Sequence, residues 1–327
     1  MCTAITYQTK DFYFGRTLDY EHGFGEELIL TPRNYPFLFR HCGLPARRYA
    51  ILGMGCVADG YPLYFDGFNE MGLAMAGLNF VGFAEYKPVE AGKDNIAQFE
   101  LIPWILGQCE SVAEAKALLA RINITGDDFR ADMPAARLHW LIADKQEAIA
   151  VEAVADGVRV WEDPVGVLTN NPPFDTQMLN LANFMQLSPK QAENRFSVPL
   201  QPYSRGMGAM GLPGDLSSQS RFVRAAFTKL NALREESENE SVSQFFHIQG
   251  SVEQVKGCCD LGNGQFEHTI YASCCNVSRG IYYYKTYENH SVCGMDMALE
   301  NLDGAVLLRW PLQRQMKIEI QNRKAQN

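Results

Sequence analysis

The sequence predicts an α+β protein in which stacked antiparallel sheets are covered by helices. Segments typical of β-strands fill the first eighty residues and return in the last third of the chain, while segments with helical periodicity lie between them. The chain has 327 residues, which is enough to bury a large core without disulfides or metal ions. Because neither a linker-like stretch nor an internal repeat divides it, we expect one domain over residues 2–327.

Six segments near the start are predicted to be strands. Each is a short apolar or β-branched run bounded by Gly, Pro, Asn, Asp or a turn-like sequence. They are Cys2–Tyr7, Phe12–Arg16, Glu27–Thr31, Tyr49–Val57, Leu63–Asn69 and Leu73–Phe80.

Helices are predicted in the middle of the chain. Ser111 and Glu114 form a capping box ahead of a helix over Ala115–Ile122, and Ser241 and Gln244 form a second box that opens a helix to about Val255. Two further helices are predicted over Ile96–Cys109, where Pro103 would introduce a kink, and over the amphipathic segment Ser217–Leu233.

The remaining predicted strands complete the two sheets. They are Leu138–Asp144, Ala148–Val154, Val158–Trp161, Thr269–Asn276, Gly280–Tyr287, Val292–Met297 and Ala305–Trp310. The polar tail 314–327 is expected to fray after the last strand.

Composition excludes several classes of protein. Subtracting 38 acidic from 29 basic residues gives a net charge of −9, which argues against a broad nucleic-acid-binding surface. The first twenty residues lack the pattern of a secretory signal, and no run of about 18 apolar residues suggests a membrane span. Nine cysteines, an odd number, indicate reduced thiols and a cytoplasmic protein.

A glycine motif resembles a nucleotide-binding fingerprint but lacks its context. Gly206, Gly208 and Gly211 have the spacing G-x-G-x-x-G, which in dinucleotide-binding proteins follows a strand and opens a helix. Pro213 follows two residues later and would interrupt that helix. We therefore interpret the segment as a glycine-rich loop.

The other reactive side chains form no recognised metal or hydrolase motif. The adjacent pairs Cys258–Cys259 and Cys274–Cys275 lack the C-x₂₋₄-C spacing of zinc sites and are interpreted as structural thiols. The sequence contains neither Gly-x-Ser-x-Gly nor His-Glu-x-x-His. His139 and His247 are interpreted as satisfied core or edge histidines.

Cys2 directly follows the initiator methionine and offers a different kind of nucleophile. If Met1 is removed, Cys2 carries both a thiol and a free α-amine, whose ordinary pKa of about 8 allows it to accept a proton near neutrality. Arg16 and Asp19 follow on the next predicted strand. A cation would lower the thiol pKa and a carboxylate would hold the amine, but residues three apart on a strand face opposite sides unless a bulge or strand end intervenes.

Eight motifs in order carry a resemblance to the choloylglycine hydrolase family, which comprises bile salt hydrolases and penicillin V acylases. They extend from Cys2 to about Asp303. They are Met1–Ala4, Phe14–Asp19, Thr31–Asn34, Asp66–Glu70, Ala76–Phe80, Leu168–Pro172, Gly211–Asp215 with Ser220–Phe222, and Tyr284–Asn289.

The resemblance implies an N-terminal-nucleophile hydrolase with an αββα sandwich, no cofactor, no metal and a homotetrameric assembly. By position, Cys2 matches the nucleophile, Arg16 the arginine beside it and Asp19 the carboxylate that orients its amine. Asn170 and Asn79 match the oxyanion-stabilising positions, and Arg221 matches the arginine that supports the network.

The implied substrate is a glycine- or taurine-conjugated bile salt. Leu18, Phe24, Ala58 and Phe65 fall where the family lines an apolar pocket, although core packing explains these residues equally well. Asn79 favours the bile salt branch over the penicillin V acylase branch, where tyrosine is common. Two alternatives remain at this point: a penicillin V acylase, and a non-catalytic binding protein that retains Met1.

Overall fold

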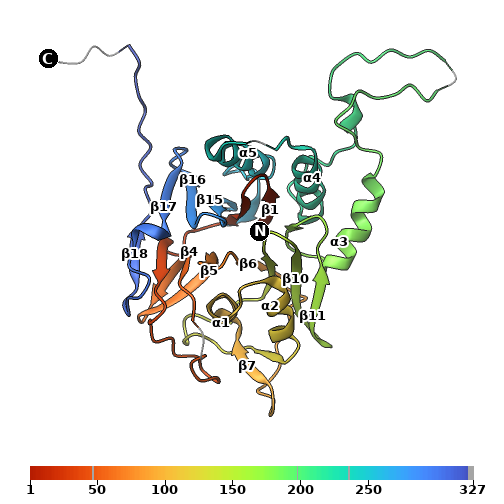
Figure 1. Cartoon of the computed structure of the whole chain (residues 1–327). Coiled ribbons are helices and arrows are strands. Elements are labelled where there is room, and N and C mark those ends of the chain that lie inside the picture. Colours follow the sequence, from red (N-terminus) through yellow and green to blue (C-terminus); the bar gives the residue numbers. More distant parts are fainter. Residues whose placement is uncertain (46–47, 197, 235, 323–327) are drawn as a thin grey trace.

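Two antiparallel sheets stacked face to face form the centre of the computed structural model, which describes residues 1–45, 48–196, 198–234 and 236–322 (Figure 1). The first sheet has the strand order β12-β1-β2-β15-β16-β17. Its strands are β1 Cys2–Gln8, β2 Phe12–Tyr20, β12 Val167–Leu168, β15 His268–Asn276, β16 Ile281–Thr286 and β17 Cys293–Asp296.

The second sheet has eight strands in the order β11-β10-β9-β6-β5-β4-β3-β18. These are β3 Glu27–Thr31, β4 Ile51–Ala58, β5 Tyr61–Asn69, β6 Ala74–Asn79, β9 Leu138–Ala143, β10 Ala148–Val154, β11 Gly157–Glu162 and β18 Leu308–Pro311. Outside the two main sheets, a parallel pair joins β7 Asp94–Ala97 to β8 Ile122–Thr125, and a hairpin joins β13 Asp260–Gly262 to β14 Gln265–Phe266.

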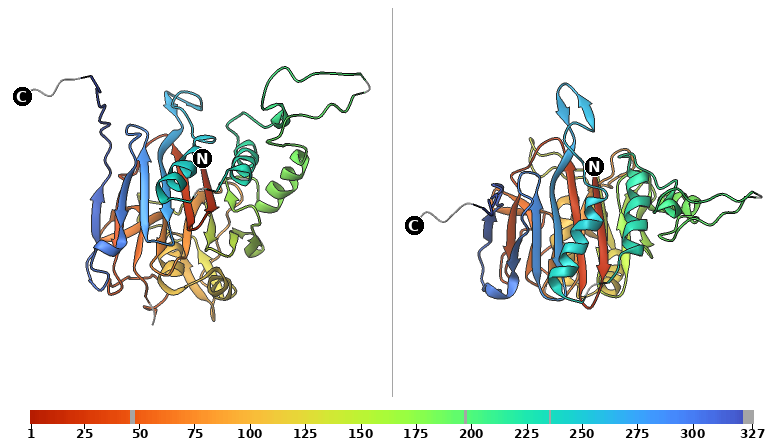
Figure 2. Two further views of the ribbon diagram at one scale, coloured as in Figure 1. Left: turned by 45° about the horizontal axis from the view of Figure 1, so that its top comes forward. Right: turned by 90° about the horizontal axis from the view of Figure 1, so that it is seen from above.

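Helices cover the outer face of each sheet. Helices α1 (Leu101–Gln108) and α2 (Val112–Leu119) lie against the second sheet, and α4 (Ser218–Asn231) and α5 (Glu238–Gly250) lie against the first (Figures 1 and 2). The short helix α3 (Phe174–Leu181) follows β12. The result is the αββα sandwich expected of an N-terminal-nucleophile hydrolase.

Strand β6 shows how the layers are built. Ala74 and Ala76 belong to the core between the sheets, whereas Leu73 and Met75 belong to the core under α1 and α2. Both faces of the strand are therefore buried, which explains why its sequence is continuously apolar rather than alternating.

Several predicted boundaries were wrong, each for a local reason. The segment predicted as a helix over Ile96–Cys109 begins as β7 and a 3₁₀ turn, and its helix starts only at Leu101. Pro103 consequently lies in the first turn, where its missing N–H is not needed. Ile122 belongs to β8 rather than to the preceding helix. Ser237, not Ser241, caps α5, in a capping box with Glu240.

The structure also contains elements that the sequence did not predict. Strands β8 and β12, helix α3 and the hairpin β13–β14 were missed, and β2 continues beyond Arg16 to Tyr20. The motif Gly206–Gly211 lies in a loop with one 3₁₀ turn and opens no α-helix. This loop is part of an excursion from the body between α3 and α4 (Figure 2). No regular structure follows β18, as predicted for the tail, whose last residues 323–327 lie outside the described part.

We predict that Gly15→Ala destabilises the fold strongly. A Cβ at Gly15 would lie 2.0 Å from the backbone oxygen of Ser273, so β2 and β15 would have to separate. The expected loss is about 3 kcal/mol or more of unfolding free energy, measured by chemical denaturation. Gly107→Ala is the control, because that buried helical glycine has free space around its Cβ and should gain about 0.5–1 kcal/mol. Equal stabilities of the two variants would contradict the prediction.

Candidate active site

Cys2 is the first residue of β1 and lies in the wall of a cavity of about 460 Å³. Its backbone pairs with Leu18 on β2, so its side chain shares a face with Leu18 and, two residues along β2, with Arg16. All three line the cavity. The cysteine identified from the sequence is thus a thiol that a ligand in this cavity would meet.

Aromatic side chains form one wall of this cavity. The rings of Phe24 and Phe65 meet edge to face with their centroids 5.7 Å apart, and the ring centroids of Phe24 and Tyr20 are 4.9 Å apart. Leu18, Phe24 and Phe65 all line the cavity, as does Asn79. Ala58 lies outside the set of lining residues, because it sits at the far end of β4 next to the β4–β5 turn, and Cys56 lines the cavity instead.

Sequence reasoning missed a large part of the opposite wall. It is formed by Phe99 from the 3₁₀ turn before α1, by Ile102 from the first turn of α1, and by Phe129 and residues 133–138 from the segment that leads from β8 into the start of β9. No periodicity marks the 126–137 segment, so its sequence carried no signal of a binding role. Together the walls are mainly apolar and suit a bulky hydrophobic ligand.

Arg16 is fully buried between the sheets. Its Nη1 donates to the carbonyl oxygens of Gly77 at 2.6 Å and Phe65 at 3.2 Å, both on the second sheet. Burial alone would lower the pKa of this guanidinium, but the Cys2 thiol and the nearby Tyr271, Asp66 and Asp19 raise it above its ordinary value. Arg16 therefore remains a cation beside the Cys2 thiol.

Asp19 points to the other side of β2. Its carboxylate accepts hydrogen bonds from Thr269 at 2.6 Å, Thr17 at 3.2 Å and Gln254 at 3.5 Å. Regular alternation therefore holds along β2, and the register shift lies on the partner strand, between Thr269 and Tyr271. Arg16 and Asp19, on opposite faces of β2, both lie near Cys2 because Cys2 is the first residue of its strand. Of the two possibilities named from the sequence, a bulge or a strand end, the structure has the strand end.

Polar contacts with Asp19, Glu267 and Asn170 hold the backbone around Cys2. The Met1 amine donates to the backbone oxygen of Asp19 at 2.7 Å and also contacts the Glu267 carboxylate. Burial lowers the pKa of this amine, although Cys2 and Asp19 oppose the effect. The Cys2 nitrogen donates to Oδ1 of Asn170 at 2.7 Å.

Arg221 fixes the orientation of the Asn170 amide. Its fully buried guanidinium donates to Oδ1 of Asn170, the backbone oxygen of Cys2 and the Thr3 hydroxyl, at 2.6–2.7 Å. Because arginine can only donate, the atom of Asn170 that faces it must be the oxygen. The Asn170 nitrogen therefore points the other way, where it donates to the backbone oxygen of Asn79 at 2.8 Å.

Buried polar side chains support the segment that carries Asn170. His139 is fully buried, stacks on Phe80 and lies 2.9 Å from the backbone oxygen of Thr169, which confirms it as a satisfied core histidine. Glu152 lies 3.4 Å from His139 and accepts from the backbone N–H of Phe174 at 2.8 Å. These contacts fix both ends of the turn between β12 and α3.

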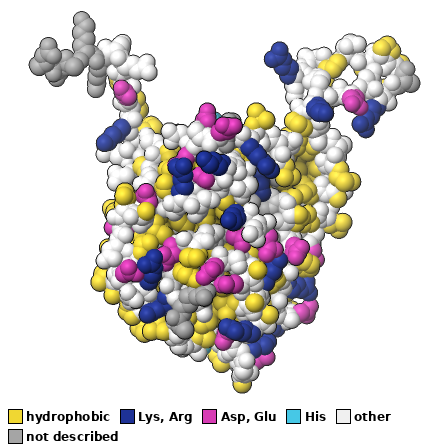
Figure 3. Space-filling model, viewed as in Figure 1, with side chains coloured by type: hydrophobic (Ala, Val, Ile, Leu, Met, Phe, Trp, Pro, Cys, Tyr) yellow, Lys and Arg dark blue, Asp and Glu magenta, His cyan; other side chains and the backbone are white. Residues whose placement is uncertain are grey.

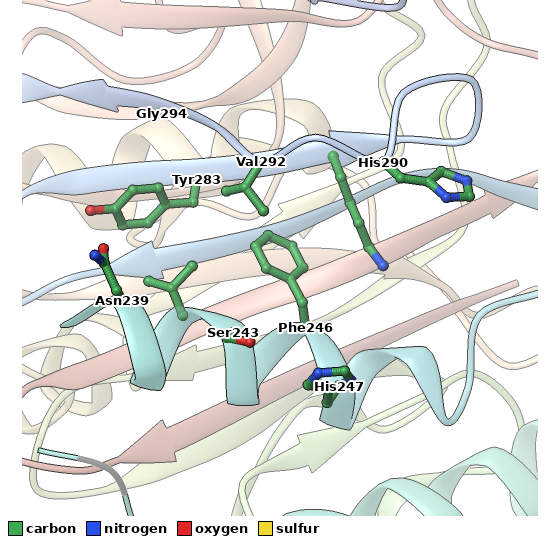
Figure 4. Close-up of a pocket in the computed structure, with 10 residues that line it drawn as sticks. Asn239, Ser243, Phe246, His247, Tyr283, His290, Val292 and Gly294 are labelled. Carbon is green, nitrogen blue, oxygen red and sulfur yellow. The ribbon is translucent and has the colours of Figure 1, made fainter. Parts of the chain in front are cut away.

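A second cavity, of about 490 Å³, lies between α5 and strands β16 and β17 (Figure 4). Ser243 and His247 from α5 face Tyr283 and Val292 across it. His247 is exposed at its rim, so the interpretation of His247 as a core or edge residue was wrong. None of the residues assigned to catalysis lines this cavity, which leaves the Cys2 cavity as the candidate active site.

The remaining cysteines are distributed through the fold. All nine carry free thiols, and Cys274 and Cys275 are buried on β15, where burial raises the pKa of both well above the ordinary value. Over the described ranges, no three His, Cys, Asp or Glu side chains gather as a metal site would require. In the same ranges, no helix combines the length and apolar character needed to cross a bilayer.

Comparison with known proteins identifies the family. A family model described as linear amide C–N hydrolases, choloylglycine hydrolase family, matches residues 2–308. The chain belongs to this family. It is therefore a hydrolase that acts on linear amide C–N bonds, and its αββα sandwich is the fold of that family.

Characterised relatives cover nearly the whole chain. A bile salt hydrolase/transferase from Lactiplantibacillus plantarum is 52% identical over 95% of this chain and 97% of its own. A bile salt hydrolase/transferase from Bifidobacterium longum is 38% identical over 94% and 99%. The crystal structure of a conjugated bile acid hydrolase from Clostridium perfringens superposes with a TM-score of 0.91 at 35% identity, covering 98% and 100%.

We predict that Arg221→Lys lowers the free energy of unfolding by about 2–4 kcal/mol. A lysine cannot reach the three acceptors at once, so buried oxygens of Cys2 and Asn170 lose their donors. Thermal and chemical denaturation measure the loss. Arg224→Lys is the matched control on the same helix, since Arg224 is half-buried and contacts only backbone oxygens. A larger loss at the control position would contradict this role for Arg221.

Proposed function

We propose that this enzyme hydrolyses bile salts conjugated to glycine or taurine, with Cys2 as the nucleophile. The observation that carries the proposal is the Cys2 thiol in the wall of a mainly apolar cavity, with Arg16 and Asn79 beside it. An apolar cavity of this size suits a steroid acyl group, and the amide to be cleaved would lie at the thiol. The relatives named as bile salt hydrolases at 38–52% identity support this choice.

The proposed reaction needs the removal of Met1. The freed Cys2 amine then takes the thiol proton, and the sulfur attacks the amide carbonyl to give a tetrahedral oxyanion. Collapse breaks the C–N bond, the ammonium returns its proton to the leaving amine, and a thioester remains. Water, activated by the same amine, hydrolyses the thioester and regenerates the thiol.

The surrounding residues have separate tasks in this proposal. Arg16 stabilises the thiolate, and Asp19 orients the amine from the opposite face of β2. Asn170 has one amide N–H left after its bond to Asn79, and the Asn79 side chain adds further donors to the oxyanion. Arg221 acts through Asn170 and the Cys2 carbonyl rather than on the substrate.

A cytoplasmic homotetramer is part of the same proposal. The excursion between α3 and α4 carries strongly exposed apolar side chains away from the body, a feature typical of contact surfaces (Figures 2 and 3). They include Met185, Phe196, Val198, Leu200, Tyr203 and Met210.

The alternative substrate is penicillin V. The structure of penicillin V acylase from Agrobacterium tumefaciens superposes with a TM-score of 0.76 at 20% identity, which shows a shared fold alone. The cavity favours the bile salt, because a steroid buries more apolar surface than a phenoxyacetyl group. A binding protein without catalysis would retain Met1 and would tolerate loss of the Cys2 thiol.

We expect the active enzyme to begin at Cys2, and Cys2→Ala to abolish turnover while Cys2→Ser keeps a small remnant. A hydroxyl is a much weaker nucleophile than a thiolate near neutrality. Intact mass and release of glycine from glycocholate are the measurements. Cys258→Ser is the control, because that thiol is exposed and does not line the cavity. Full activity from chains that keep Met1 would rule out the mechanism.

We expect kcat/KM to be about 50-fold higher for glycocholate or taurocholate than for penicillin V. An extra ~100 Å² of buried apolar surface at about 25 cal/mol per Å² corresponds to this ratio if it is realised in the transition state. Phe65→Asp should reduce bile salt turnover more than penicillin V turnover, because it places a charge in the aromatic wall.

Met71→Asp is the control for Phe65→Asp, since it puts the same charge on the β5–β6 turn outside the cavity. A wild-type preference for penicillin V would overturn the substrate assignment. If Phe65→Asp lowers kcat/KM equally for bile salts and for penicillin V, the substrate assignment stands and Phe65 serves packing only.

A further inference from the structure

A buried carboxylate that the proposed reaction does not use lies directly behind Arg16. Asp66 on β5 is fully buried between the sheets. Its two oxygens accept hydrogen bonds from the hydroxyl groups of Tyr271 at 2.5 Å and Tyr282 at 2.6 Å. The two tyrosines come from β15 and β16 of the opposite sheet, so this cluster spans the gap between the sheets.

Asp66 and Arg16 are joined through the backbone of β5 and β6. Arg16 Nη1 donates to the carbonyl of Phe65, the residue before Asp66, and to the carbonyl of Gly77. Gly77 is one position beyond Ala76, the β6 partner of Asp66. The anion is therefore placed close behind the cation that flanks the Cys2 thiol.

Asp66 and Arg16 each influence the pKa of the other. Burial raises the pKa of Asp66, and Arg16 and the two tyrosine hydroxyls oppose that rise. Asp66 in turn helps to raise the pKa of Arg16. Arg16 Nη2 is buried without a hydrogen-bond partner among the described residues, so part of its charge is compensated only at a distance.

We propose that Asp66, held by Tyr271 and Tyr282, is a positioning residue that limits how strongly Arg16 stabilises the Cys2 thiolate. The inference rests on the proposed function in taking Cys2 as the nucleophile. An uncompensated guanidinium beside the thiol would favour the thiolate more strongly and lower the thiol pKa. A thiolate of lower pKa is intrinsically less nucleophilic, so the counter-charge keeps Cys2 reactive while also stabilising the burial of Arg16.

Other titratable groups share this region, and the variant Asp66→Asn leaves all of them unchanged. Those facing Asp66 are Arg16 from β2, Cys275 and Tyr271 from β15, and Tyr282 from β16. Those facing Cys2 are the chain-terminal amine, Arg16, Asp19, Tyr20, Arg221 and Tyr271.

The deciding experiment measures alkylation of Cys2 by iodoacetamide against pH, with the labelled peptide quantified by mass spectrometry. Asp66→Asn is the test variant, because an amide of the same shape can still accept from one tyrosine hydroxyl and donate to the other. Loss of one charge in this region should shift the alkylation midpoint about one pH unit lower. The plateau rate at high pH should fall about threefold, following the dependence of thiolate nucleophilicity on pKa.

Asp144→Asn is the matched control. Asp144 is also a buried carboxylate, but it accepts backbone N–H groups beside the β9–β10 turn. Its variant should leave both the midpoint and the plateau at their wild-type values. A purely structural role for Asp66 would lower stability in Asp66→Asn without moving the midpoint, and that result would overturn the proposal.

A second variant covers the case in which Asp66→Asn does not fold. Tyr271→Phe combined with Tyr282→Phe removes both tyrosine donors to Asp66, so the pKa of the buried carboxyl should rise further and its negative charge should fall. The midpoint should again move to lower pH, and an unchanged or higher midpoint would overturn the proposal. Alkylation needs no substrate, so a failure to cleave bile salts would refute the proposed function and leave this result interpretable.

Discussion

Two fully buried guanidinium groups, one on each face of the first strand pair, determine the arrangement of the site. Arg16 lies between the sheets, and Arg221 is a buried residue of α4, which covers the outer face of the first sheet. A buried cation is costly unless its N–H groups are bonded and its charge is balanced. The carbonyls of Phe65 and Gly77 serve Arg16, and those of Cys2 and Leu216 serve Arg221. Because the Cys2 carbonyl is one of these acceptors, the hydrogen bonds that the buried Arg221 needs also fix the backbone at Cys2.

The position of Cys2 at the start of a strand gives it access to both faces of the sheet. Its thiol shares the inner face with Arg16, while its nitrogen meets Asn170 and its carbonyl meets Arg221. In the middle of a strand the main-chain nitrogen would be used in sheet pairing. The proposed reaction, in which Met1 is removed and Cys2 supplies both nucleophile and base, fits this position because the Cys2 nitrogen donates to the Asn170 side chain rather than to a strand.

The sequence predicted those features that are local to the chain or tied to motifs. Strand segments were predicted because apolar runs lie between turn residues. Cys2 was singled out by its position after Met1 and Arg16 by its place on the next strand, whereas Asn170 was assigned only through the family motifs. The residues that hold them were not found. Gln254 and Thr269 meet Asp19 only because β15 pairs with β2 and α5 ends beside it, contacts 235 and 250 residues apart in sequence. No periodicity or spacing encodes such contacts.

The same limit explains the errors around the cavity. Ala58 follows the alternation of Cys56 on β4, so sequence pattern alone could not show where along the strand the cavity ends. The opposite wall is formed by an irregular segment, 126–137, whose position depends on the parallel pair β7–β8. That pair lies outside both main sheets. The strand pattern that predicted the two main sheets therefore could not predict where segment 126–137 lies.

Asn170 shows how an irregular segment can be held as firmly as a strand. Strand β12 is only two residues long and ends just before Thr169, so the ladder contributes little beyond it. The turn is fixed instead by side chains from three other elements: His139 from β9, Glu152 from β10 and Ser218 from α4. His139 and Ser218 bond backbone groups of Thr169 and Asn170 that a strand partner would otherwise satisfy, and Glu152 accepts the N–H of Phe174 at the start of α3. Because His139 and Glu152 are fully buried and Ser218 is partly buried, these bonds are shielded from water, and the Asn170 amide can be placed before a substrate arrives.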